Sequence, residues 1–146
     1  MSEGVASEPR VEELMELIRS GMLAIQDGDR EALERAVAGS WHEECEWVPL
    51  LAGVEGETYH GRDGLVSFYL DLLDSFEIRY QDLELRRIAN SIVVLTEMSS
   101  RGRESGVVVG TELGILCELD GDLIRRGKAY DSHAAAIAAA EELAHA

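Results

Sequence analysis

The stretch that most constrains the fold is YHGRDGLVSFYLDLLDSF, from Tyr59 to Phe76. Its apolar side chains recur at helical spacing, which predicts one apolar stripe along a helix of about four turns. The stripe consists of Leu65, Phe68, Tyr69, Leu72, Leu73 and Phe76. Asp63 places a negative charge near the start of this helix, where the helix dipole favours one. Because nearly everything after Phe76 has strand character, we predict that the helix covers a sheet built from the second half of the chain.

Two helices are expected ahead of this stretch, of which the second is short. An apolar period that begins at Pro9 predicts the first, and Gly28 suits the left-handed conformation found just after a helix C-terminus. Asp29 can then accept a hydrogen bond at the start of a second helix, over about residues 30–38. Before both helices we expect a flexible leader over residues 1–8.

The remaining segments favour strands. WHEECEWVPL, residues 41–50, predicts a strand that Pro49 ends or places at a sheet edge, and residues 53–58 predict a loop. Four more strands are expected, over Ile78–Ile88, Ile92–Arg101, Val107–Leu119 and Leu123–Tyr130. The alanine-rich run from His133 predicts a terminal helix that Asp131 or Ser132 caps.

The dipeptide at 120–121, Asp-Gly, predicts a tight hairpin that sets the register of the last two strands, with Ile115 opposite Arg126. Two faces of the sheet follow. The more apolar face should meet the helices, and it carries Val94, Thr96, Met98, Val109, Thr111, Leu113, Ile115, Cys117, Ile124, Arg126, Lys128 and Tyr130. The other face is polar and rich in glycine, which suits solvent, a bend in the sheet or a partner sheet. It carries Glu97, Ser99, Arg101, Val108, Gly110, Glu112, Gly114, Arg125, Gly127, Ala129 and Asp131.

Composition narrows the class of protein. A chain of 146 residues with 46% hydrophobic residues can form one domain with its own core, here residues 9–146. The net charge of −16 repels phosphate backbones and anionic headgroups, which argues against nucleic-acid and membrane-surface binding. Cys45 and Cys117 have no metal-ligand spacing and suggest buried thiols in a reducing compartment. The first ten residues lack the pattern of a signal peptide, so we expect a cytoplasmic protein.

The order of these elements resembles the cone-shaped α+β fold of the NTF2-like superfamily, and specifically its SnoaL-like branch of polyketide cyclases and ketosteroid isomerases. The matching stretches are QDGDREAL, WHEECEWVP, YHGRDGLVSFYLDLL and LDGDLIRRGKAYD. The resemblance implies a curved, mainly antiparallel sheet wrapped around a conical pocket. Three helices from the N-terminal half would cover the sheet, with a short helix at the C-terminus. It also implies a small-molecule ligand and a homodimer through the outer sheet face.

The catalytic groups of ketosteroid isomerases do not carry over. Their first-helix tyrosine falls at Gly21, their general base at Val48 and their oxyanion-binding acid at Ile115. Only the supporting tyrosine of the long helix is retained, at Tyr69. Because neither glycine nor a hydrocarbon side chain moves a proton, we do not expect isomerase chemistry by that mechanism.

Other side chains remain candidates for a site. If the side chains of the first strand alternate inward and outward as in the family, Glu46, Val48 and Leu50 point into the cone. Arg126, Tyr130 and Tyr69 could join them there to orient a polar molecule. The alternative is that Glu46 and Arg126 only pair with each other. The expected ligand-binding residues are Trp47, Val48, Phe68, Met98, Thr111, Leu113, Ile115, Arg126 and Tyr130.

Several candidates have a structural alternative. His42 is a possible general base but lies at a strand entrance, where exposure is common. For Trp41 and Trp47, packing in the core or at its rim is favoured over stacking on a ligand. The Asp131 carboxylate can cap the last helix or reach the pocket mouth. We found no metal-ligand spacing, nucleophilic triad, phosphate-binding loop or dinucleotide motif, and we expect no cofactor.

Residues 104–105, if they close the preceding hairpin, place Met98 opposite Thr111 and Glu97 opposite Glu112. The two glutamates would share a proton if buried, and would be solvated on an outer face.

Two hypotheses of different kinds follow. In the first, the protein binds an apolar or mildly polar molecule and acts on it as an isomerase, cyclase or lyase through Glu46, His42 or Tyr69. In the second, it is a non-catalytic dimeric binding or interaction module. An enzyme of the first kind should have a carboxylate or an imidazole in the wall of its pocket.

Overall fold

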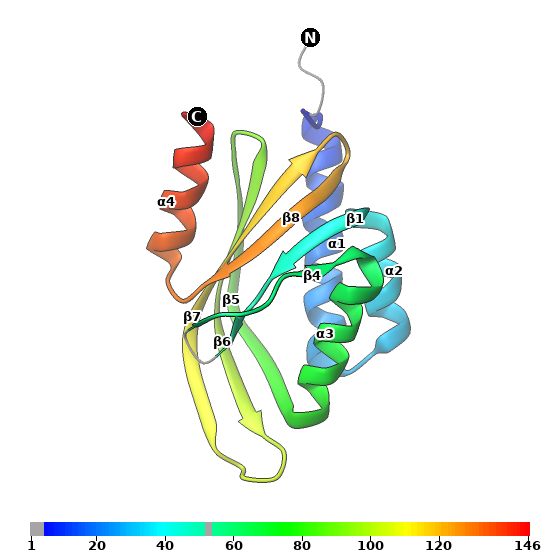
Figure 1. Ribbon diagram of the computed structural model, residues 1–146, viewed down its shortest axis with the longest axis vertical. Coiled ribbons are helices and arrows are strands. Elements are labelled where there is room, and N and C mark those ends of the chain that lie inside the picture. The colour runs from blue at the N-terminus through cyan, green and yellow to red at the C-terminus, as the bar shows by residue number, and fades with distance from the viewer. Residues whose placement is uncertain (1–4, 52–53) are drawn as a thin grey trace.

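The computed structural model describes residues 5–51 and 54–146. Three helices cover one face of a six-stranded sheet: α1 (Glu8–Asp27), α2 (Arg30–Ser40) and α3 (Gly61–Ser75). A fourth helix, α4 (His133–Ala144), lies on the opposite side, as Figure 1 shows. None of the helices in the described part of the chain combines the length and apolar character that a membrane span requires.

The first two helices begin and end as their capping residues predict. Ser7 accepts a hydrogen bond from the Arg10 amide at 3.3 Å, so α1 starts at Glu8. Gly28 has φ 69° and follows α1, and Asp29 accepts from the Ala32 amide at 3.1 Å to open α2. The expected flexible leader lies partly outside the described residues, at 1–4, and stays a prediction.

The long sheet has the order β4-β1-β8-β7-β6-β5. Its strands are β1 (Trp41–Val48), β4 (Tyr59–His60), β5 (Phe76–Ile88), β6 (Ser91–Gly102), β7 (Val108–Asp120) and β8 (Leu123–Tyr130). Only β1 and β8 pair in parallel, so the sheet is mainly antiparallel. The predicted α+β fold class is confirmed.

The connection between β1 and α3 differs in detail from the prediction. The strand expected over residues 41–50 breaks at Pro49, and β2 (Leu50–Leu51) instead pairs with β3 (Val54–Glu55). Gly53, in the expected loop, lies outside the described residues. The first two residues of the stretch from Tyr59 to Phe76 form β4, which pairs with β1 before the helix begins.

The register of β6 against β7 is as predicted, with Met98 opposite Thr111. The register of β7 against β8 differs from the prediction. The hairpin loop is Gly121-Asp122, with Gly121 at φ 62°, and a bulge follows between the 118–126 and 119–124 pairs. As a result Ile115 lies opposite Ala129 rather than Arg126. The single extra residue exchanges the two faces of β8 beyond the bulge.

The main core lies between the sheet and α1, α2 and α3. Its sheet residues include Val94, Leu113, Ile115, Cys117 and Ile124, all of which were assigned to the apolar face. A second, smaller core fills the opposite face, where Val93, Leu95 and Leu116 pack against Ala136 and Ala140 of α4. The glycine-rich face is therefore partly covered by α4.

Candidate functional site

A cavity of about 180 Å³ lies between α3, the end of β1 and the inner face of the sheet. Fourteen residues line it: Trp47, Pro49, Leu50, Phe68, Tyr69, Leu72, Phe76, Ile78, Tyr80, Met98, Ser100, Leu113, Ile115 and Ala129. Phe76, one of the lining residues, is 38% exposed. This is the most ligand-like space in the described part of the chain, because apolar walls with few polar groups are typical of small-molecule sites.

An aromatic cluster forms the wall of the cavity between β1 and α3. The Trp47 ring centroid lies 6.0 Å from that of Phe68 and 5.9 Å from that of Tyr69. Phe68 and Tyr69 are consecutive residues of the α3 stripe, and their ring centroids are 5.1 Å apart. These edge-on and tilted contacts stabilise the rings in fixed orientations.

Gly127 on β8 provides the space in which the Trp47 ring lies. A Cβ atom at this position would lie 2.4 Å from the Trp41 ring and 3.1 Å from the Trp47 ring. Trp47 pairs with Gly127 across β1 and β8, and the glycine leaves room for both tryptophan rings. The tryptophan is thereby held in the cavity wall and is only 3% exposed.

The polar groups of the cavity are few and neutral. The lining residues that carry a polar side-chain group are Trp47, Tyr69, Tyr80 and Ser100. Burial raises the pKa of Tyr69 and of Tyr80 well above the usual value, and the proximity of Tyr80 adds to the effect on the pKa of Tyr69. Both phenols therefore stay protonated at neutral pH and can act as hydrogen-bond donors.

The lining residue Trp47 carries a buried polar atom, its indole nitrogen. It is buried and has no hydrogen-bond partner among the residues that the structure describes. A buried N–H left without a partner costs roughly 1–3 kcal/mol. An acceptor on a bound molecule would remove this cost.

A second cavity, of about 60 Å³, lies deeper, between the sheet and α1, α2 and α3. Trp47, Tyr69 and Ile115 line both cavities and so form the partition between them. Cys117 lines the inner cavity, and burial raises the pKa of its thiol to about 12. The thiol is therefore protonated and unreactive at neutral pH.

Of the three predicted catalytic residues, only Tyr69 lines the cavity. Glu46 lies in a row with Arg126 and Glu118 on the outer face, where its carboxylate is 3.7 Å from Arg126 Nε. The prediction that Glu46 points inward is wrong, because β1 has the opposite phase and directs Trp47 into the core. The pairing of Glu46 with Arg126, which was the alternative, is what the structure shows.

His42 also lies outside the cavity. Its Nδ1 accepts a hydrogen bond from the Glu44 amide at 2.9 Å, at the entrance of β1. Among the described residues, neither cavity has a carboxylate or an imidazole in its wall.

The predicted ligand-binding residues divide into two groups. Those that line the cavity are Trp47, Phe68, Met98, Leu113 and Ile115. Those that do not are Val48, Thr111, Arg126 and Tyr130.

Val48, Arg126 and Tyr130 lie on the outer face for two different reasons. The outward position of Val48 follows from the phase of β1, and the outward positions of Arg126 and Tyr130 follow from the bulge in β8. Tyr130 lies opposite Gly114 and packs with the smaller core under α4. Thr111 is exposed, because β8 ends opposite Gly114 and leaves this part of β7 at the edge of the sheet. Ser132, and not Asp131, caps α4 by accepting from the Ala135 amide at 3.0 Å.

Eight cavity residues were not among the predicted catalytic or ligand-binding residues: Pro49, Leu50, Leu72, Phe76, Ile78, Tyr80, Ser100 and Ala129. A signal for two of them was present, because Tyr80 alternates with Ile78 and Ser100 alternates with Met98 along strands that were assigned correctly. Alternation alone could not place Ala129, because the bulge decides on which face of the sheet its side chain lies.

Comparison with known proteins supports the fold. No protein-family model matches the sequence, and no curated protein matches it either. Solved structures do match. One is a protein with a ketosteroid isomerase-like fold from Catenulispora acidiphila, in complex with trimethylamine, at a TM-score of 0.66 and 12% identity, covering 86% of this chain and 92% of that one.

Two further structures extend the comparison. TerC, co-crystallised with polyporic acid, matches at a TM-score of 0.63 and 16% identity, over 91% of this chain and 98% of its own. A SnoaL-like protein from Jannaschia sp. CCS1 matches at 0.63 and 15% identity, over 89% and 90%. At these identities the comparison shows a shared fold, which is the NTF2-like cone that the sequence resembles.

Proposed function

We propose that this chain, which has the NTF2-like fold, binds a small, largely apolar molecule with one hydrogen-bond acceptor in the cavity beneath α3. Its volume of about 180 Å³ suits a molecule of the size of one substituted aromatic ring. An apolar cavity of about 150 Å³ in another protein holds benzene. The aromatic wall of Trp47, Phe68 and Tyr69 offers faces and edges against which such a ring can pack.

The observation that carries this proposal is an apolar cavity with Trp47 among its lining residues, whose buried indole N–H has no hydrogen-bond partner among the described residues. A carbonyl or ether oxygen on the ligand would accept from it, and the phenols of Tyr69 and Tyr80 are additional donors. Two solved relatives of the same fold contain small molecules, trimethylamine in one and polyporic acid in the other.

Between the two hypotheses from the sequence, the cavity favours binding without acid–base chemistry. Its described wall offers only neutral donors and apolar groups, whereas an isomerase, cyclase or lyase of the expected type needs a group that accepts a proton near neutral pH. Tyr69 and Tyr80 do not meet this need, because burial raises the pKa of each phenol.

The proposal can be tested with two probes of nearly the same shape. Acetophenone carries a carbonyl acceptor, and α-methylstyrene carries a CH2 group in its place. We expect calorimetric titration to show acetophenone binding more tightly, by about fivefold to tenfold for a gain of about 1–1.5 kcal/mol from one hydrogen bond. In W47F, which keeps an aromatic ring but removes the N–H, the two probes should bind alike. Equal affinity for both probes in the wild-type chain would refute the role of the indole, and no binding of either would refute the site.

A further inference from the structure

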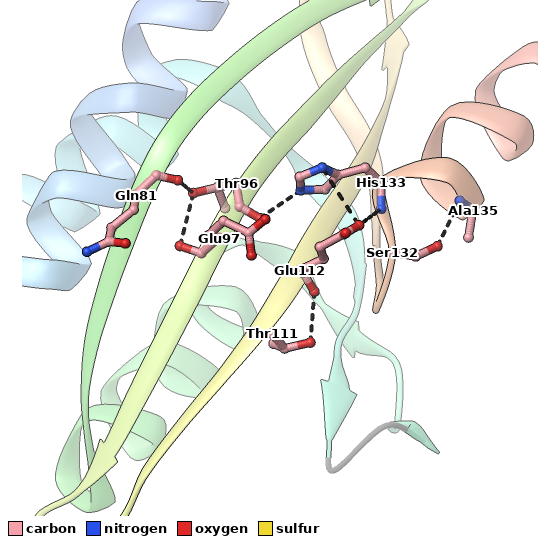
Figure 2. A network of polar contacts seen from close by, with 8 residues as sticks. All are labelled: Gln81, Thr96, Glu97, Thr111, Glu112, Ser132, His133 and Ala135. Atoms are coloured by element: carbon pink, nitrogen blue, oxygen red, sulfur yellow. Dashed lines mark hydrogen bonds and ion pairs between the residues drawn. The ribbon is translucent and has the colours of Figure 1, made fainter.

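A second group of convergent side chains lies on the outer face of the sheet, opposite the cavity. It consists of Glu97 from β6, Glu112 from β7 and His133 from the first position of α4 (Figure 2). One ligand atom from each residue lies within 4.8 Å of the other two. We propose that these three residues bind a divalent transition-metal ion of the Zn²⁺ type.

The two glutamates are directly opposite each other across the β6–β7 ladder. Like charges in this arrangement destabilise a sheet. In the described part of the chain, no lysine or arginine forms an ion pair with either carboxylate. Among the described residues, the basic side chain beside them is the imidazole of His133, whose Nδ1 is 3.7 Å from Glu112 Oε1. The pair is therefore arranged to receive a cation.

The orientation of His133 is fixed by a contact outside this group. Its Nε2 lies 2.8 Å from the carbonyl oxygen of Thr96. Because a carbonyl only accepts, Nε2 carries the hydrogen, and in the neutral ring the lone pair is then on Nδ1, which faces Glu112. A histidine that ligates a metal usually donates its other N–H to a backbone carbonyl or a carboxylate in this way.

A bulge in β5 makes the Thr96 carbonyl available. The β5–β6 register shifts between Gln81 and Glu84, and Thr96 has no partner residue on β5. Asp82 within the bulge has φ 53°. Bulges of this kind often lie beside functional sites, where they end local strand pairing or redirect a side chain.

The start of α4 is also held in place. Glu112 Oε1 accepts a hydrogen bond from the His133 amide at 2.8 Å, as Figure 2 shows, and Ser132 caps the helix. At Gly114 the helix approaches β7 so closely that a Cβ atom would lie 2.6 Å from Ala136 Cβ. The imidazole is thereby positioned by the fold and not by a mobile loop.

The ligand set determines which ions fit. Imidazole nitrogen favours zinc and its neighbours in the first transition row, whereas sites for Mg²⁺ and Ca²⁺ use oxygen ligands. Ligands at about 2.0–2.2 Å from a tetrahedral zinc ion are about 3.4 Å apart, close to the 3.7 Å between His133 Nδ1 and Glu112 Oε1. Glu97 and Glu112 are exposed, so small rotations of their side chains can close the remaining distance, and water can take the open position.

One part of the local electrostatic field opposes the binding of a cation. The positive end of the α4 dipole disfavours a cation by about 0.3–1 kcal/mol. The negative charges of the two carboxylates outweigh this contribution of the dipole. Glu84 on the neighbouring β5 also interacts electrostatically with His133, although Glu84 is itself paired with Arg86. A proton on Nδ1 is the competing occupant, and the experiment must distinguish the two.

Calorimetric titration of the purified full chain with Zn²⁺ and, separately, with Mg²⁺ tests the site. We expect one Zn²⁺ per chain and much weaker Mg²⁺ binding. The variants E97Q, E112Q and H133N should each weaken Zn²⁺ binding at least about tenfold. Gln at 112 keeps an oxygen that can accept from the His133 amide, so α4 should stay in place, which circular dichroism can verify.

Two matched variants serve as controls. H145N and E142Q remove the same kinds of group near the far end of α4, where both side chains are exposed, and they should leave Zn²⁺ binding unchanged. Absence of Zn²⁺ binding, or binding that persists unchanged in H133N, would mean that only a proton occupies the space and would overturn the proposal. Mg²⁺ binding as tight as that of Zn²⁺ would overturn the assignment to a transition metal.

Discussion

Arg126 Nη1 donates to Glu118 Oε2 at 3.0 Å across β8 and β7, and the same guanidinium lies 3.7 Å from Glu46. All three side chains lie on the outer face, away from the cavity. This row defines what Glu46 does. It contributes to a half-exposed ion-pair network and lies outside the cavity.

Replacement of Glu46 by Gln should therefore leave ligand binding unchanged. Partly exposed ion pairs contribute about 0–1 kcal/mol, so the free energy of unfolding should fall by no more than that. Titration of E46Q with acetophenone, beside urea denaturation, measures both quantities. A loss of probe affinity in E46Q would show that Glu46 takes part in ligand binding.

Gly114 should be intolerant of a larger side chain. A Cβ atom there would lie 2.6 Å from Ala136 Cβ and 3.1 Å from the Ser132 carbonyl oxygen, so G114V should force α4 away from β7. Overpacking of this kind costs typically 1–3 kcal/mol. Gly110 on the same strand has nothing within 4 Å of its added Cβ, so G110V is the matched control. Equal unfolding free energies for the two variants in urea would contradict the packing of α4.

The largely buried side chains of Tyr69 and Tyr80 predict a loss of stability in alkaline solution. Burial raises the pKa of Tyr69 and of Tyr80 in the folded chain, so above pH 10 the unfolded chain releases these protons more readily than the folded chain. The unfolded state then binds fewer protons, and the free energy of unfolding falls as pH rises, by up to about 1.4 kcal/mol per pH unit for each tyrosine.

Urea denaturation between pH 8 and pH 11 measures this slope. The double variant Y69F/Y80F lacks both phenols and should lose stability less steeply over the same range. Identical slopes for the wild-type and double-variant chains would show that the two hydroxyls are in contact with water.

A homodimer through the outer sheet face stays a prediction, and the structure suggests where to test it. Val107, Val108 and Val109 are each about 60% exposed, at the start of β7. Val108 is paired with Arg101 and shares the outer face with Gly110 and Glu112. We expect light scattering at micromolar concentration to give twice the chain mass, and V108E to give the mass of one chain. A monomeric mass for the wild-type chain would contradict the dimer.

Much of the fold could be predicted because its signals are local. Gly28 and Asp29 mark one helix boundary, and the α3 stripe predicts which residues meet the sheet. Alternation along β6 and β7 placed Met98, Leu113 and Ile115 correctly in the cavity wall. Local periodicity is set by backbone geometry, so a single sequence is enough to recognise it.

The errors in the site have a common physical origin. The hairpin loop lies one residue later than predicted, so Leu119 lies opposite Ile124 instead of Asp122. This shift of two residues leaves each side chain before the bulge on its predicted face of the sheet. The extra residue at the bulge then exchanges the faces, and so moves Arg126 and Tyr130 outward and Ala129 inward. Nothing in LIRRGKAY marks the bulge, because it is a response to pairing with two neighbouring strands at once.

The most direct test of the cavity is the NMR signal of the Trp47 indole N–H. The chain has two tryptophans, so Trp41 provides an internal reference within the same sample. On addition of acetophenone we expect the Trp47 indole proton to shift downfield as it gains an acceptor, while α-methylstyrene leaves it nearly in place. An indole signal of Trp47 that responds to neither probe, or equally to both, would contradict a ligand site built around this donor.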